Sequence, residues 1–374
     1  MHTATPLFNL SRTIRPLSSP PSESSNSAAK VIAVGTANSE NCYTQRELLE
    51  RFKIDDLRIR SVFLNGGIEK RFLALPECDP GGGPAHESQG ELLEKHRREG
   101  IEMGKRALQR CLDSAGMDLS DLGYLCCVTT TGLLTPGLSA LISHELDLPR
   151  TCARLDVVGM GCNAGLNGLN AVRNWAEANP GQLGIMLCIE VCSAAYVFDG
   201  TMETAVVNSL FGDGSAAVAV IAGVPVATAP SILKFSSLLI TEAIGAMRFN
   251  WDDAFGKFSF YLDRDVPYVV GAHAERVISS LLEDTGLRRN DISHWIIHSG
   301  GKKVIDAVRI NLGLSKHDVR HTTAVLSNFG NLSSGSFLFS LERLFEENLA
   351  SPGDYGVFMT MGPGSTIETA LIRW

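Results

Sequence analysis

A cysteine at the start of a predicted helix is the residue of this chain best suited to act as a nucleophile. Cys162 follows an apolar, strand-like stretch that breaks at Gly159 and Gly161 and then becomes helical. The first turn of a helix has unpaired N–H groups and the positive end of the helix dipole, which favour a thiolate. Small residues at Ala164 and Gly165 leave room for an acyl group. An isolated cysteine is more often a buried, inert thiol, so Cys162 needs partners.

Two polar residues in the second half of the chain could act with this cysteine. His298 ends the apolar run 295–297, and Asn331 follows Gly330 at the start of another helix of small residues. A neutral imidazole and a carboxamide can both donate to a thioester oxygen and stabilise an enolate, whereas an imidazolium would pair with a thiolate. This set suits carbon–carbon condensation, although a cysteine hydrolase also uses Cys and His. Taken singly, a strand-end histidine and a helix-capping asparagine are the commoner explanations.

An internal repeat places these residues in register. In each copy a helix ends at a glycine, and a buried strand then runs into a loop of small residues. The matching stretches are 112–116 with 282–286, 121–129 with 291–299, and 161–165 with 330–334. The spacing is 170 positions for the first two pairs (282 − 112) and 169 for the third (330 − 161). If the two halves are related by pseudo-symmetry, Cys162 and Asn331 face a common centre and His298 lies between them.

Strands alternate with helices along the chain. The predicted buried strands are 31–34, 125–129, 184–189 and 216–221, and the predicted helices are 102–115 and 269–284. This alternation predicts an α/β fold in which helices cover mixed sheets.

The chain is expected to divide into two halves after an N-terminal extension. Pro225 and Pro230 interrupt the pattern, which puts the boundary between residues 31–228, with the nucleophile, and residues 229–374, with the histidine and asparagine. Residues 1–30 are rich in Ser, Pro and Thr and lack the apolar core of a signal peptide. We expect them to be a disordered extension.

Bulk composition excludes several classes of function. The net charge of −8 and a pI near 5.6 argue against nucleic acid or an anionic membrane as partner. No apolar run approaches the roughly 20 residues of a membrane span. The nine cysteines, mostly in apolar segments, indicate reduced thiols and a cytoplasmic location. No Cys-x-x-Cys or His-Glu-x-x-His motif is present, so no metal site is expected.

Two further groups of residues could shape a site. Gly362, Pro363, Gly364 and Ser365 form a rigid loop after a predicted strand, which could bring backbone close to a thioester. Phe211 and Phe260 could line an apolar channel or steer a departing carboxylate, with ordinary core packing as the competing explanation.

Several motifs together resemble the type III polyketide synthases, the chalcone-synthase-like condensing enzymes of the thiolase fold. The motifs are GCNAG (161–165), LFGDG (210–214), HSGG (298–301), NFGNLSS (328–334) and GPG (362–364). The resemblance covers nearly all of residues 31–374. It implies a thiolase-like duplicated αβαβα layered fold, Cys162 as nucleophile, His298 and Asn331 as the decarboxylation pair, and Phe211 and Phe260 as gatekeepers.

The resemblance also implies substrates and partners. Malonyl-CoA would be the substrate, neither a metal nor a redox cofactor would be needed, and the protein would form a homodimer. Helper proteins similar to enoyl-CoA hydratases could belong to the same pathway. Lys70 and Arg71 are candidates to bind the CoA phosphates, with a solvated basic pair as the alternative.

Positions at which this chain differs from the plant members of the family narrow the range of expected products. Plant members usually have an aromatic residue in place of Asn163, Pro in place of Ser299 and Gly-Phe in place of Thr360 and Met361. These changes argue against a chalcone or stilbene product. The runs WDDAF (251–255) and DRDVP (263–267) are similar instead to bacterial members that build an aromatic ring for glycopeptide antibiotics.

Three other functions stay open at this point. A different polyketide product, such as a resorcinol, pyrone or naphthalene, would need the same residues. An initiating ketoacyl carrier-protein synthase shares the Cys-His-Asn set but typically has His-Gln-Ala-Asn where this chain has HSGG (298–301). A non-catalytic scaffold that binds acyl-CoA is the alternative from outside the enzymes.

Overall fold

The computed structural model describes residues 28–78, 85–226 and 228–374. Of the extension predicted to be disordered, residues 1–27 therefore lie outside the described residues. The chain enters the fold at Lys30, the first residue of strand β1.

One nine-stranded sheet runs through the molecule in the order β11-β12-β13-β8-β1-β7-β6-β4-β5. Its strands are β1 (Lys30–Ala37), β4 (Leu122–Thr129), β5 (Ala153–Val158), β6 (Leu183–Glu190), β7 (Gly214–Ile221), β8 (Ser231–Leu239), β11 (Ile292–Ile297), β12 (Tyr355–Gly362) and β13 (Thr366–Arg373). Strands β1 and β8 share only the pair Lys30 and Ser231. The sheet is thus two mixed parts that meet at one end of β1, each built from one half of the chain.

Ten helices and two small sheets complete the described part of the fold. The helices are α1 (Gln45–Arg51), α2 (Leu57–Asn65), α3 (Gln89–Ala115), α4 (Leu138–Glu145), α5 (Ala164–Ala178), α6 (Met202–Leu210), α7 (Val266–Leu282), α8 (Lys302–Asn311), α9 (Arg320–Phe329) and α10 (Ser336–Glu347). The small sheets pair β2 (Cys42–Thr44) with β3 (Lys70–Phe72) and β9 (Met247–Asp252) with β10 (Lys257–Leu262).

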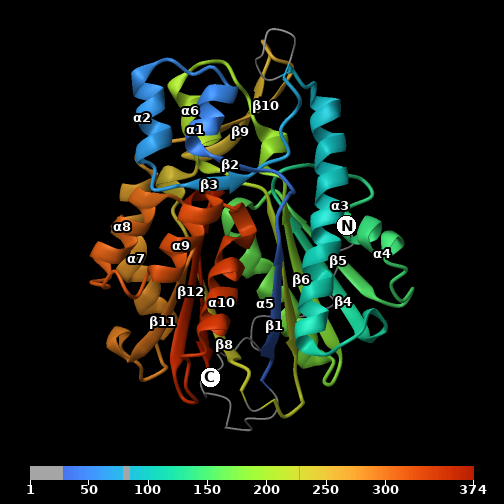
Figure 1. Ribbon diagram of the computed structural model, residues 1–374. Coiled ribbons are helices and arrows are strands. Elements are labelled where there is room, and N and C mark those ends of the chain that lie inside the picture. Colours follow the sequence, from blue (N-terminus) through green and yellow to red (C-terminus); the bar gives the residue numbers. More distant parts are fainter. Residues whose placement is uncertain (1–27, 79–84, 227) are drawn as a thin grey trace, which may run out of the picture.

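Three apolar cores hold the elements in five layers. Helices α5 and α10 lie between the two parts of the sheet, α3 covers one outer face, and α7 and α8 cover the other (Figure 1). Alternate residues of β4 serve different cores, with Cys126 and Val128 facing α5 while Leu125 and Cys127 face α3. Both faces are buried, which is why the strands are continuous apolar runs. This is the layered, thiolase-like α/β fold expected from the sequence.

The predicted strands and the predicted end of helix α3 are confirmed, but the other helix boundaries were wrong. Helix α3 starts at Gln89 and not at residue 102, because Ser88 and Glu91 form a capping box. It ends at Ala115, and Gly116 follows as a left-handed cap with a φ of 64°. Helix α7 starts at Val266 with a proline in its first turn and ends at Leu282.

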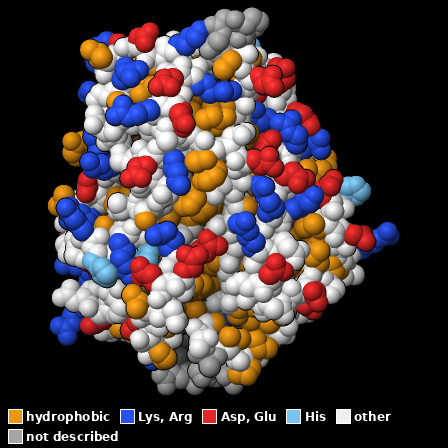
Figure 2. All heavy atoms as spheres, in the orientation of Figure 1, with side chains coloured by type: hydrophobic (Ala, Val, Ile, Leu, Met, Phe, Trp, Pro, Cys, Tyr) orange, Lys and Arg blue, Asp and Glu red, His pale blue; other side chains and the backbone are white. Residues whose placement is uncertain are grey.

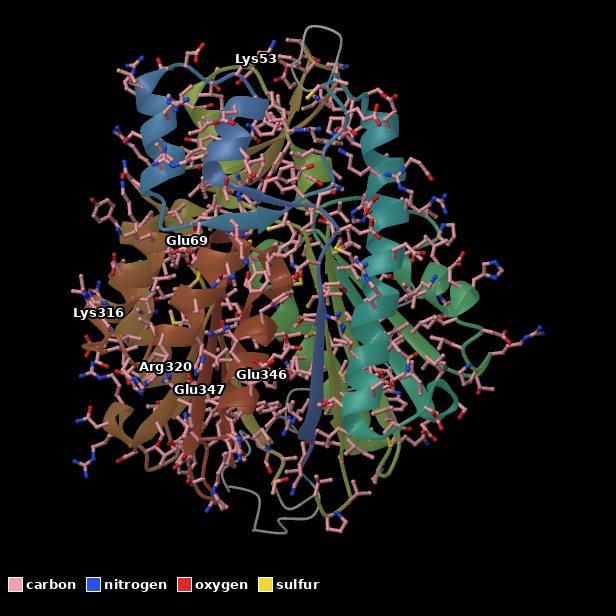
Figure 3. The ribbon with its side chains drawn as sticks, in the orientation of Figure 1. Lys53, Glu69, Lys316, Arg320, Glu346 and Glu347 are labelled. Atoms are coloured by element: carbon pink, nitrogen blue, oxygen red, sulfur yellow. The ribbon has the colours of Figure 1, made fainter. Side chains whose placement is uncertain are left out.

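A surface ion pair connects the two helices that flank the Asn331 loop, at their ends away from that loop. The Nη2 atom of Arg320 on α9 lies 2.6 Å from Oε2 of Glu347 on α10, and both side chains are labelled in Figure 3. This contact joins the two helices on either side of the loop 330–335. On the face shown in Figure 2, basic and acidic side chains are interspersed, without a continuous patch of one sign.

Within the described ranges, each helix is too short or too polar to span a bilayer. The same residues contain no group of three or more His, Cys, Asp or Glu that could hold a metal ion.

Candidate active site

The turn between β5 and α5 presents Cys162. Gly159 and Gly161 have φ values of 84° and 81°, a region that residues with a side chain rarely adopt. Cys162 then lies in the short 3-10 turn that leads into α5, and it is 7% exposed. A Cβ atom on Gly161 would lie 2.0 Å from Cδ of Pro363, so the glycine is needed for this close approach.

The glycine-proline loop packs against the cysteine, as predicted. A Cβ atom on Gly362 would lie 2.9 Å from the backbone nitrogen of Cys162. Pro363 lines the same cavity as Cys162. Ser365 instead donates its hydroxyl to the carbonyl oxygen of Ala243 at 2.7 Å, and Gly364 has a φ of 75°. The last two residues hold the loop in place and do not belong to the described lining of the cavity.

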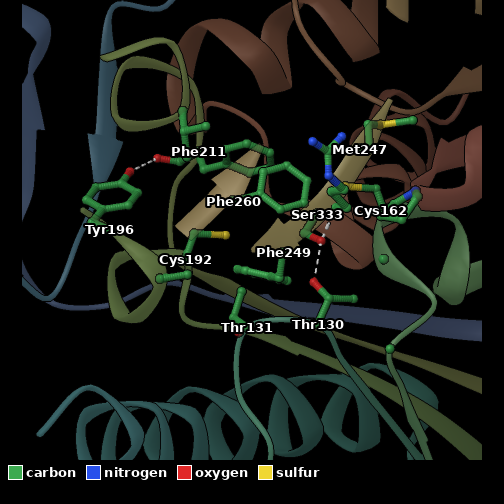
Figure 4. Close-up of a pocket in the computed structure, with 16 residues that line it drawn as sticks. Thr130, Thr131, Cys162, Cys192, Tyr196, Phe211, Met247, Phe249, Phe260 and Ser333 are labelled. Atoms are coloured by element: carbon green, nitrogen blue, oxygen red, sulfur yellow. Dashed lines mark hydrogen bonds between the residues drawn. The ribbon is translucent and has the colours of Figure 1, made fainter. Parts of the chain in front are cut away.

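A cavity of about 350 Å³ opens at Cys162 (Figure 4). We call it the chamber. Its walls are largely apolar, and Phe211 after α6 and Phe260 on β10 both line it. Their rings meet edge to face, with 5.7 Å between centroids and 88° between planes. The two phenylalanines therefore lie together at the site, where a gatekeeping role requires them.

The loops that carry His298 and Asn331 meet the loop of Cys162. Ser333, two residues after Asn331, has its Oγ 3.4 Å from Sγ of Cys162. Ser299, next to His298, donates to the carbonyl oxygen of Gly330 at 3.4 Å. His298 and Asn331 are only 2% and 3% exposed. The structure thus gathers the three loops predicted from the repeat, although the chamber is lined by Cys162 and not by the other two residues.

The amide of Asn331 has a defined orientation. Its Oδ1 accepts the backbone N–H of Ser333 at 2.8 Å, so the amide N–H₂ group stays available as a donor. The backbone of Asn331 is fixed as well, because its N–H donates to Leu210 and its carbonyl oxygen accepts from Gly212. Asn331 and Phe211 are therefore held in one rigid contact between the halves.

Burial opposes the thiolate that the helix start was expected to favour. It raises the pKa of the Cys162 thiol to about 12, although the Ser333 hydroxyl counteracts it in part. Burial also lowers the pKa of His298 to about 3. Burial thus disfavours the charged form of each of the two side chains, and the helix start does not by itself ionise the thiol.

A buried carboxyl group near the cysteine was missed in the sequence. Oε2 of Glu190 accepts the N–H and hydroxyl of Thr130 at 3.0 and 3.1 Å, and Ser334 binds Oε1. Thr130 also contacts Oγ of Ser333 at 2.9 Å, which continues the network to Cys162. Burial raises the pKa of Glu190 to about 7. The feature of the sequence that could have revealed this group is an acidic residue at the end of an otherwise apolar stretch, which forms the entirely buried strand β6.

Arg71 does not bind CoA phosphates, contrary to our prediction, and it is not a solvated residue either. Its side chain is completely buried. The guanidinium donates to Oε1 of Gln45, the hydroxyl of Tyr196 and the carbonyl oxygen of Phe211, at 2.9, 2.9 and 2.6 Å. It therefore supports the backbone of Phe211. Lys70, the preceding residue on β3, is exposed and stays a candidate for the phosphates.

Comparison with known proteins agrees with this geometry. The family models for chalcone and stilbene synthases match twice, the N-terminal domain at residues 75–225 and the C-terminal domain at residues 253–374. The chain is 64% identical over 341 residues to 3,5-dihydroxyphenylacetyl-CoA synthase of Amycolatopsis orientalis, covering 91% of this chain and 92% of the relative. Identity to the enzyme of the same name from Streptomyces toyocaensis is 60% over 350 residues, covering 92% and 90%.

Solved structures show the same fold. The 1,3,6,8-tetrahydroxynaphthalene synthase of Streptomyces coelicolor A3(2), a bacterial type III polyketide synthase, aligns with a TM-score of 0.82 at 26% identity, over 92% of this chain and 99% of that one. PKS-I of the brown alga Ectocarpus siliculosus aligns with a TM-score of 0.83 at 24% identity, over 92% and 98%.

Proposed function

Because this chain belongs to the chalcone and stilbene synthase family, which includes type III polyketide synthases, we propose that it condenses malonyl-CoA and cyclises the tetraketide to 3,5-dihydroxyphenylacetyl-CoA. The observation that supports this product assignment is the sequence identity of 60 to 64% to synthases of that name over more than 90% of the chain. The enzyme class is that of an acyltransferase that forms carbon–carbon bonds through a cysteine thioester.

In the first step an acyl group is transferred to Cys162. Sγ attacks the thioester carbonyl carbon while its proton passes to His298, since the buried thiolate is costly without a proton acceptor. The carbon–sulfur bond to CoA then breaks, and the CoA thiolate takes the proton from the imidazolium. The starter acetyl group arises when the malonyl unit loses CO₂ and the carbon of the resulting enolate takes up a proton from water.

In the second step another malonyl-CoA loses CO₂ beside His298 and Asn331. The electrons of the broken carbon–carbon bond form an enolate, and the neutral imidazole and the free N–H₂ group of Asn331 donate to its oxygen. The apolar rings of Phe211 and Phe260 favour this loss because they solvate a carboxylate poorly. The enolate carbon attacks the waiting thioester, and Sγ of Cys162 is the leaving group.

Two more condensations give the tetraketide, and an aldol-type ring closure with loss of water gives the aromatic ring. The thioester and the release of CO₂ supply the driving force, so the proposal needs neither a metal nor a redox cofactor. Helper proteins similar to enoyl-CoA hydratases that speed dehydration, and the cytoplasmic location, stay predictions.

A homodimer is part of the proposal. Strand β5 is the last strand of the sheet, and it pairs on one side only, with β4. Its side chains are mostly exposed, among them Leu155 at 37% and Val158 at 42%. An unpaired apolar edge is a surface that proteins normally cover, and a second copy can cover it by pairing the same edge.

Incubation of the purified protein with malonyl-CoA alone tests the proposed function. We expect CO₂ release and a product with the mass of 3,5-dihydroxyphenylacetyl-CoA or its free acid, together with an acetyl adduct on the Cys162 peptide. A pyrone, a resorcinol or a naphthalene would replace the product assignment but keep the family chemistry. Acyl transfer to a carrier protein without ring formation would favour the ketoacyl synthase, and binding without CO₂ release would favour the scaffold.

A further inference from the structure

The chamber contains a cation that the mechanism above does not use. Among the described residues that line it, Arg248 alone has a formal charge. It lies on β9 between Met247 and Phe249, which line the chamber too. Arg248 is exposed to solvent, whereas Cys162 is buried, so the guanidinium belongs to the outer part of the chamber.

The contacts of Arg248 leave a binding edge open. Its Nε donates to Oδ1 of Asn250 at 3.0 Å, and its Nη1 donates to the carbonyl oxygen of Gly245. The guanidinium carbon stands 4.2 Å from the ring centroid of Tyr261, the cross-strand partner of Arg248 on β10. Nη2 donates no hydrogen bond to any residue that the structure describes. One N–H of Nη1 and both of Nη2 are therefore free, on the edge that fits a carboxylate with two parallel hydrogen bonds.

The charge of Arg248 is not neutralised by a direct ion pair. Within the described residues, no Asp or Glu oxygen forms a salt bridge with it at 4.0 Å or less. Asp263 attracts it from a longer distance, but that carboxylate accepts the hydroxyl of Tyr261 at 3.1 Å and the backbone N–H of Asp265 at 2.8 Å. A net positive charge is consequently available to an anionic group that enters the chamber.

We propose that Arg248 recognises the free carboxylate of malonyl-CoA and thereby selects malonyl-CoA over acetyl-CoA, an inference that rests on the proposed function. The two thioesters share the whole CoA part and differ only in this carboxylate. A residue that distinguishes them must therefore bind the carboxylate itself. An arginine with a free edge does this better than any other lining residue of the chamber.

Recognition and decarboxylation take place at different points of the chamber. A carboxylate held by a guanidinium is stabilised and retains its CO₂, because the cation favours the charged ground state. Transfer toward Phe211 and Phe260 removes that stabilisation and leaves the carboxylate against apolar rings. Arg248 thus acts when malonyl-CoA first binds, before decarboxylation. This role explains how every acyl unit, including the starter, can derive from malonyl-CoA.

Binding titrations with malonyl-CoA and acetyl-CoA test the selection. They are made on a Cys162→Ala background, where no acyl group is transferred to that residue. We expect Arg248→Gln to weaken malonyl-CoA binding about tenfold, the effect of one charge-assisted hydrogen-bonded pair, and to leave acetyl-CoA binding within twofold. Arg248→Lys should restore part of the preference. Arg264→Gln is the matched control, since Arg264 has a 94% exposed side chain outside the chamber lining.

Kinetics on the active enzyme add a second measurement. CO₂ release should show a higher KM for malonyl-CoA in Arg248→Gln with a kcat within twofold of the unchanged protein. If the two thioesters lose affinity equally, Arg248 only supports the hairpin through Tyr261, and the proposal is wrong. Unchanged malonyl-CoA affinity also overturns it. Failure of the unaltered enzyme to release CO₂ would count against the proposed function, while the binding ratio still decides the role of Arg248.

Discussion

The chemistry of Cys162 depends on where its proton can go. Burial raises the pKa of this thiol to about 12 and leaves His298 neutral over the usual working range of pH. Proton transfer from sulfur to the imidazole creates two opposite charges that stabilise each other, whereas loss of the proton to water leaves one buried charge. In the proposed mechanism His298 therefore has two roles, proton acceptor during acylation and hydrogen-bond donor during decarboxylation.

Replacement of the histidine should expose the intrinsic acidity of the thiol. We expect His298→Ala to slow alkylation of Cys162 by iodoacetamide at pH 7 at least about tenfold. The remaining rate should rise steadily to pH 10, because a thiol with a pKa of about 12 is still mostly protonated there. Peptide mass spectrometry gives the rate at this one cysteine. His294→Ala, on the strand β11 that precedes His298, is the control, and equal profiles for both variants would refute the acceptor role of His298.

The buried arginine and its exposed neighbour offer a second comparison at this scale. Removal of Arg71 leaves Oε1 of Gln45 and the hydroxyl oxygen of Tyr196 without this donor, and the carbonyl oxygen of Phe211 keeps only the Tyr196 hydroxyl. We expect Arg71→Met to lower the free energy of unfolding by about 3 kcal/mol or more in urea titrations, since buried unsatisfied groups are expensive. Lys70→Met should change it by less than about 0.5 kcal/mol. A loss of similar size in both variants would contradict the assignment of Arg71 to the core.

At the scale of the element, the turn before α5 sets the position of the nucleophile. Gly159 and Gly161 share a positive φ, but only Gly161 is in contact with Pro363. We expect Gly159→Ala to cost about 1 to 2 kcal/mol of stability from backbone strain alone. Gly161→Ala should cost more and abolish acylation of Cys162, because its Cβ would displace the Gly362–Pro363 loop. Thermal unfolding and an acyl-adduct assay separate the two effects, and equal behaviour of the variants would contradict this role of the contact.

The sequence predicted those elements whose signal is local. The buried strands are uninterrupted apolar runs, and the spacing of the internal repeat alone matched Cys162 with Asn331. The first turns of α3 were missed because residues 89–99 are largely charged, and only the Ser88–Glu91 cap marks the true start. Arg71 and Lys70 could not be told apart, since which of them is buried depends on what covers β3. The chamber wall at β9 is likewise set by tertiary packing.

At the scale of the whole molecule, the two halves are needed together. Cys162 comes from one half and His298 and Asn331 from the other, and α5 and α10 pack in the core between them. The unpaired edge of β5 lies on the same strand that leads to Cys162. Assembly of two copies along this edge would therefore also stabilise the turn that presents the nucleophile.

A charge on that edge tests the assembly. We expect Leu155→Lys to shift the protein from dimer to monomer in sedimentation experiments, because like charges would face each other across the pairing. Ile310→Lys is the control, since this residue of α8 is 65% exposed and lies far along the sheet from β5. A dimer that persists in Leu155→Lys places the interface elsewhere.

The hairpin of β9 and β10 has a consequence for how such enzymes diversify. It is a two-stranded ribbon separate from the nine-stranded sheet, yet it supplies Met247, Arg248, Phe249 and Phe260 to the chamber. Mutations can accumulate on this ribbon without disturbing the central layers that hold the nucleophile and its partners. Natural or engineered substitutions on this hairpin can thus change the shape of the chamber, and with it the polyketide product, while Cys162 and its partners stay the same.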